Sequence, residues 1–150
     1  MSHQINQLCE DIKTAITVSG VSIYDLDDIM LNIPGANCPC LMPWPVTLLT
    51  GWRVETLAFG TGANVPKRVY FTLQYRYFYA PASMGKADFK KFDDAIDKYE
   101  LIVEAFMNDD DIGQAYDIQP RQTGAFGLVL DPGGKYFIGA DLFLDCTQER

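Results

Sequence analysis

Four cysteines are the first residues in this sequence that could do chemistry. Cys38 and Cys40 flank Pro39 in a CxC arrangement, while Cys9 and Cys146 lie far from them along the chain. Four thiolates could hold a structural zinc ion, but such sites usually draw their ligands from paired CxxC motifs. The spacing therefore favours buried or inert thiols, kept reduced in a cytosolic setting. We predict no metal site and no cofactor.

Other catalytic signatures are incomplete. The sole histidine, His3, stands at the start of the chain and gives no credible base for a Ser/His or Cys/His pair. Gly60–Val65 begins like a GxGxxG phosphate loop but lacks the third glycine. Asn108–Gly113 resembles the start of a calcium loop, but Ile112 occupies a ligand position. We therefore predict that the protein is not an enzyme.

The charge of the chain is acidic and uneven. Its net charge is -8, and acidic residues concentrate in Asp88–Glu104 and Asp109–Asp111. The segment Met30–Gly85 is the exception, with four basic residues against Glu55 alone. An acidic surface repels phosphate backbones, which argues against tight DNA or RNA binding. No apolar run approaches the roughly 20 residues that span a bilayer, and the polar first residues are no signal peptide, so we expect a soluble, unsecreted protein.

The segment Val69–Tyr79, VYFTLQYRYFY, predicts a strand with two well-used faces. Base-stacking sheets of RNA-binding domains need a basic surface and an RNP pattern, and this chain lacks both. We expect the face with the odd-numbered residues to lie in the core and the even face, with Arg76 and Phe78, to contact a neighbouring subunit. Alternation gives Val69, Phe71, Leu73, Tyr75, Tyr77 and Tyr79 on the first face, and Tyr70, Thr72, Gln74, Arg76 and Phe78 on the second.

The elements that must position these residues follow the order of an α+β domain. Apolar spacing predicts an amphipathic helix at His3–Ile16 and a long helix from about Lys86 to Met107. We predict one α+β domain over residues 1–150: an antiparallel β-sheet of about four to five strands, with both helices packed on it and extended loops at 31–45 and 60–67. Val46–Leu49 and Trp52–Phe59 are expected to form one bent strand or two short ones, followed by a strand at Arg68–Tyr79 and a weaker candidate at Tyr116–Ile118. The last strands are expected at Ala125–Leu130 and Lys135–Asp145, joined by the turn Asp131–Gly134.

This layout resembles the tail terminator proteins of long-tailed bacteriophages and the neck and tail-completion proteins that share their fold. The similarity lies in the N-terminal helix, the segment MPWPVTLLTG, a long strand ending in FYAPA, the helix of ADFKKFDDAIDKYELIVEAF and the late strand KYFIGADLFLD. The resemblance implies a non-catalytic virion subunit, assembled in the host cytoplasm. Such subunits form a homohexameric ring that caps the tail tube, meets a head-closure or neck protein, and lets genomic DNA pass without specific binding.

Two alternatives stay open beside this interpretation. One is a head-closure or tail-tube-like component of the same structural class. The other is a small ligand-binding domain or enzyme with a pocket that includes Tyr75, Tyr77 or Arg76. For the ring, the less acidic part of the chain is expected to supply the subunit contacts, through Trp44, Arg53, Lys67, Arg68, Tyr70, Arg76 and Phe78.

Overall fold

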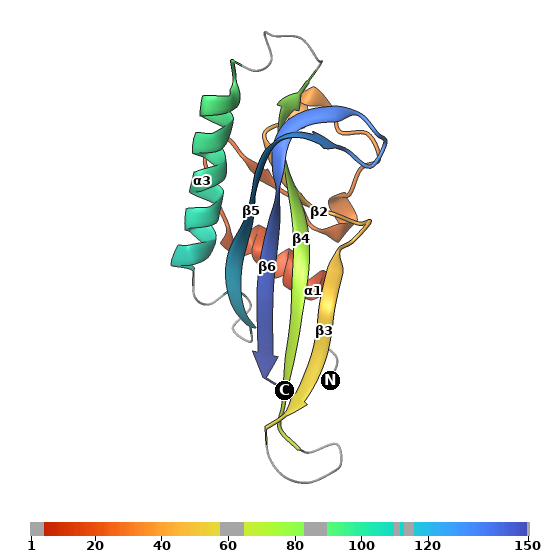
Figure 1. Ribbon diagram of the computed structural model, residues 1–150, viewed down its shortest axis with the longest axis vertical. Coiled ribbons are helices and arrows are strands. Elements are labelled where there is room, and N and C mark those ends of the chain that lie inside the picture. The colour runs from red at the N-terminus through yellow and green to blue at the C-terminus, as the bar shows by residue number, and fades with distance from the viewer. Residues whose placement is uncertain (1–4, 58–64, 83–89, 110–111, 113–115, 150) are drawn as a thin grey trace.

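Two helices and one curled sheet make up the described part of the chain (Figure 1). The computed structural model describes residues 5–57, 65–82, 90–109, 112 and 116–149. Within them the strands follow the order β1-β2-β4-β6-β5, with β3 also paired to β4. The elements are α1 (Ile5–Ala15), β1 (Ser22–Ile23), η1 (Leu26–Asp28), η2 (Gly35–Asn37), β2 (Cys40–Pro43), β3 (Leu49–Thr56), β4 (Lys67–Pro81), α3 (Phe92–Asn108), β5 (Tyr116–Leu130) and β6 (Tyr136–Glu149).

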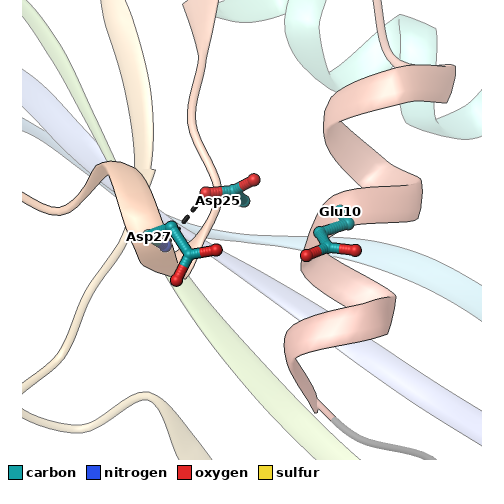
Figure 2. A group of neighbouring side chains, drawn as sticks. All are labelled: Glu10, Asp25 and Asp27. Carbon is teal, nitrogen blue, oxygen red and sulfur yellow. Dashed lines mark hydrogen bonds between the residues drawn. The ribbon is translucent and has the colours of Figure 1, made fainter.

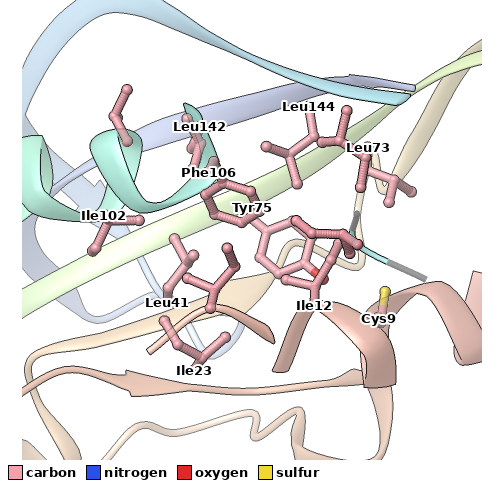
Figure 3. Packing of buried hydrophobic residues seen from close by; sticks show 14 of the residues in the cluster. Cys9, Ile12, Ile23, Leu41, Leu73, Tyr75, Ile102, Phe106, Leu142 and Leu144 are labelled. Atoms are coloured by element: carbon pink, nitrogen blue, oxygen red, sulfur yellow. The ribbon is translucent and has the colours of Figure 1, made fainter. Parts of the chain in front are cut away.

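The main core lies between the sheet and both helices. Apolar residues of α1 and α3 meet the odd-numbered residues of β4 and the matching residues of β6 in one buried cluster. Figure 3 shows Tyr75 at its centre, between α1, α3 and the sheet. The predicted core face of Val69–Tyr79 is therefore confirmed for Val69, Phe71, Leu73, Tyr75 and Tyr77, which are all buried.

A second, smaller cluster lies on the opposite face of the sheet. It joins Phe78 of β4 and Phe137 of β6 to side chains of the proline-bearing stretch 31–45, among them Trp44. The backbone nitrogen of Ile33 donates a hydrogen bond of 3.2 Å to the buried carboxylate of Asp131, at the β5–β6 turn. The apolar loop is thus docked on its own sheet.

The predicted mixture of helices with a sheet is confirmed, but the described sheet has six strands rather than four to five. It is also not wholly antiparallel, since β1 pairs with β2 in parallel. The additional strands are β1, which is only two residues long, and β2, which the prolines around it concealed. Pro39 precedes β2 and Pro43 ends it, so neither interrupts the middle of the strand.

The boundaries of two other elements also differ from the prediction. The expected strands at Tyr116–Ile118 and Ala125–Leu130 are parts of a single strand, β5. Pro120 is tolerated there because β5 has only β6 as a neighbour among the described strands. The helix α3 begins at Phe92, whereas residues 86–89 of the predicted helix lie outside the described residues.

Candidate functional site: the exposed edge strand

Strand β3 forms a sheet edge that the other described residues leave exposed. It pairs with β4 alone among the described strands, and all eight of its residues are exposed. Leu49, Trp52 and Val54 are 38%, 45% and 51% exposed, although large apolar side chains are normally drawn into the core. An apolar edge strand of this kind is a template for contact with another chain.

A β-bulge decides which face these apolar side chains occupy. The register shifts between Thr50 and Arg53, so that Gly51 and Trp52 together oppose Phe71. Gly51 has φ of 66°, in the left-handed region that glycine adopts without strain. The extra residue turns Trp52 onto the helix-bearing face, where its ring stacks on Phe71 with centroids 5.2 Å apart.

The reverse face of the same edge carries charged residues. The guanidinium of Arg53 lies 4.2 Å from the centre of the Tyr70 ring. Arg68 Nη2 lies 2.5 Å from Glu149 Oε1, and this hydrogen bond raises the pKa of Arg68. Glu55 is the cross-strand partner of Arg68.

Four of the residues predicted for subunit contacts therefore gather at one end of the β3–β4 ribbon: Arg53, Lys67, Arg68 and Tyr70. The apolar residues Leu49, Trp52 and Val54 were not among the predicted contacts. The signal for them was Gly51 inside an alternating strand, since an isolated glycine there often marks a bulge.

The other three predicted contact residues lie elsewhere, and two of them are buried, which corrects the prediction for those two. Phe78 is fully buried and Trp44 is 7% exposed, both in the second cluster. Arg76 lies 3.7 Å over the Trp44 ring and bonds Asp141. Sequence alternation placed Phe78 and Arg76 on the correct face, but the chain's own loop covers that face, so a neighbouring subunit cannot reach Phe78 or Trp44.

The four thiols do not converge on a common site. Cys9 and Cys146 belong to the core cluster, whereas Cys40 belongs to the second cluster on the opposite face, with Cys38 packed against it. All four are free. Burial raises the pKa of Cys9 to about 11, as expected for a thiol in an apolar setting. The sheet thus separates the ligands that a four-thiolate zinc site would need.

Three carboxylates, Glu10, Asp25 and Asp27, lie within 4.8 Å of one another (Figure 2). Asp25 Oδ1 accepts a hydrogen bond from the backbone nitrogen of Asp27, at 2.9 Å, and caps η1. Lys13 Nζ lies 3.7 Å from Asp25 Oδ2 and 2.7 Å from Asp28 Oδ2, and its hydrogen bond lowers the pKa of Asp28. A turn cap and a lysine account for Asp25, the buried member of this cluster.

A surface cavity of about 310 Å³ lies between η2, the end of β4 and α3. Tyr75, Tyr77 and Arg76 do not line it, so the ligand-binding alternative was wrong to place them in this pocket. Tyr77 instead donates a hydrogen bond of 3.1 Å to the carbonyl of Ala95. The lining residues are Gly35, Cys38, Pro39, Tyr79, Ala80, Lys91 and Lys98.

No model of a known protein family and no curated protein matches the sequence. Among the described helices, none has the length and apolar character needed to cross a membrane.

Proposed function

We propose that this protein is a structural virion subunit of a long-tailed bacteriophage, a tail terminator that forms a homohexameric ring at the head–tail junction. The observation that supports self-association is β3, an edge strand with eight exposed residues, three of them large and apolar. Natural proteins usually protect such edges with short strands, charges or a covering element. Here a neighbouring subunit supplies the cover.

The phage assignment is supported by the order of the elements, because it is the order on which the resemblance to tail terminator proteins rests. An N-terminal helix, a long strand ending in FYAP, a long helix and a long late strand are present as α1, β4, α3 and β6. The ring caps the tail tube and meets a head-closure or neck protein. A net charge of -8 per subunit suits passage of DNA without adhesion.

Native mass spectrometry of the purified chain, alone and with tail tubes, tests this function. We expect a mass of six subunits and, in negative stain, a ring with a central hole. A chain that stays monomeric under all conditions and never binds tubes would contradict the proposal. A long polymer in place of a closed ring would favour the tail-tube-like alternative.

Edge variants show whether β3 is the surface used. Leu49→Asp combined with Val54→Asp should abolish the hexamer, because both side chains lie on the exposed edge and neither fills the core. Leu31→Asp is the matched control, since Leu31 is 71% exposed but lies outside β3. If the β3 variant assembles as the control does, β3 is not the contact surface.

The ligand-binding alternative is favoured by one feature, the cavity with Lys91 and Lys98 in its lining. A small anion bound there would appear as a mass adduct in the same native spectrum. An adduct that is lost in a Lys91→Ala, Lys98→Ala variant, together with a monomeric chain, would favour that function over the ring.

A further inference from the structure

We infer that the apolar face of β3 receives helix α3 of a second copy of this chain, arranged head to tail around the ring. This inference rests on the proposed function and names the contact that closes the ring. A ring built from one kind of contact needs two different surfaces on each subunit, one for each neighbour. In Figure 1, α3 lies toward the β5 edge of the sheet and β3 forms the opposite edge, as head-to-tail contacts require.

The first surface is the helix-bearing face of the β3 edge. Trp52 and Val54 lie on it beside Val69 and Phe71 of β4. Lys67, two residues before Val69, lies on the same face. The acidic groups of this edge, Glu55 and Glu149, belong to the reverse side with Arg68. This face is therefore apolar with one positive charge, and Trp52 and Val54 on it are 45% and 51% exposed.

The second surface is the exposed side of α3. Four acidic residues, Asp93, Asp97, Glu100 and Glu104, recur at steps of four, three and four, which aligns them along one side of the helix. All four are exposed. Within the described residues their carboxylates form no ion pair or hydrogen bond, and Lys67 forms no ion pair.

The acidic row is costly for an isolated subunit. Like charges four residues apart destabilise a helix by roughly 0.2–0.5 kcal/mol per pair. Glu104 also lies near the C-terminal end, where the helix dipole disfavours negative charge and α3 has no basic residue in its last turn. A basic group of a neighbouring subunit would relieve both effects.

Apolar side chains flank the acidic row on both sides. Ile96, Leu101 and Met107 are 36%, 50% and 65% exposed, so α3 matches β3 in apolar area as well as in charge. Docked on β3, the neighbour's α3 would cover Trp52 and Val54 and bring its carboxylates to Lys67. The helix layer would then continue from one subunit to the next.

Charge reversal tests the contact. In 50 mM salt, Lys67→Glu should weaken each subunit contact about two- to fivefold, as loss of an exposed ion pair does. Glu100→Lys with Glu104→Lys should weaken it similarly, and all three changes in one chain should restore assembly. Lys135→Glu and Asp117→Lys are matched controls at exposed positions outside both surfaces. If both sets of changes weaken the subunit contact separately but the chain that carries all three does not regain assembly, Lys67 does not pair with Glu100 and Glu104.

A zero-length carbodiimide cross-link on the unmodified protein gives a readout that does not depend on folding of variants. In a mixture of ¹⁴N and ¹⁵N subunits, Lys67 should link to Glu100 or Glu104 in peptides that carry both labels. Rings without such links, and without any effect of charge reversal, would overturn the α3 contact and leave the ring intact. If the unmodified chain never assembles, the proposed function falls and the contact with it.

Discussion

The guanidinium of Arg76 bonds Asp141 across the β4–β6 pair while its Cζ lies 3.7 Å from the centre of the Trp44 ring. The Arg76 Nε to Asp141 Oδ1 distance is 2.7 Å, and Arg76 Nη1 donates to the Leu130 carbonyl at 3.0 Å. One side chain thus ties β4, β5, β6 and the docked loop together. Arg76 was predicted to contact a neighbouring subunit, but the contacts above lie within its own chain, so we expect its loss to affect folding.

Arg76→Ala should lower the free energy of unfolding by about 1.5–3 kcal/mol, because charged hydrogen bonds and a cation–π contact are lost. Urea denaturation measures the change. Arg121→Ala is the matched control: its bridge to Asp145 is about half exposed, and we expect a loss below about 1 kcal/mol. If the Arg76 variant is as stable as the unmodified protein but assembles poorly, Arg76 contacts a neighbouring subunit as first predicted.

Tyr75→Phe should stabilise the protein by about 1 kcal/mol. The Tyr75 hydroxyl is buried and has no hydrogen-bond partner within the described residues. Burial raises its pKa, and the nearby Cys9 thiol adds to the effect, although the contact lacks the geometry of a hydrogen bond. Removing an unsatisfied buried hydroxyl removes its desolvation cost.

Thermal unfolding compares Tyr75→Phe with Tyr99→Phe. The Tyr99 hydroxyl donates a 2.8 Å hydrogen bond to the Asp141 carbonyl, so its removal should cost about 1 kcal/mol. Opposite signs for the two variants are the expected result. A destabilised Tyr75→Phe protein would mean that this hydroxyl has a partner in solution.

Cys38 should be the fast-reacting thiol of the four. The neighbouring Cys40 thiol lowers the pKa of Cys38, with a further contribution from the charge of Lys135. Burial raises the pKa of Cys9 and Cys146. At pH 7.5, iodoacetamide should modify Cys38 at least about tenfold faster than the others, as peptide mass spectrometry would show. Uniform rates would contradict the burial of the other three.

The carboxylate of Asp145 should stabilise the folded protein at neutral pH and lose this effect when it is protonated in acid. Its pKa is lowered from 3.8, first by hydrogen bonding to Arg121 and then by Thr72. A depressed pKa in the folded state means that the contribution is complete above the unfolded value and is lost as pH falls through the folded value. Because the side chain is 44% exposed, we expect less than about 1 kcal/mol.

Asp145→Asn isolates this contribution. At pH 7 the variant should unfold at a slightly lower urea concentration than the unmodified protein, and near pH 2 the two should coincide. Thr147→Ala serves as a control on the same strand and should give a constant difference at both pH values. A difference between Asp145→Asn and the unmodified protein that persists at pH 2 would exclude protonation as its cause.

The sequence by itself determined the long helix, the Asp131–Gly134 turn and the two faces of β4, because these follow from local periodicity and turn chemistry. It also indicated the strands that form most of β3 and β4, from their runs of β-branched and aromatic residues. Local spacing suffices for such features because neighbouring residues fix them.

Only the tertiary structure decided what covers each face. Alternation put Phe78 on the second face of β4, but the path of the loop at 31–45 buried it, held by the bond from Ile33 to Asp131, 98 residues away. The bulge at Gly51 likewise put Trp52 and Val54 on the same face of β3 as Leu49. Contacts between distant segments depend on chain path, which the period of a single strand does not encode.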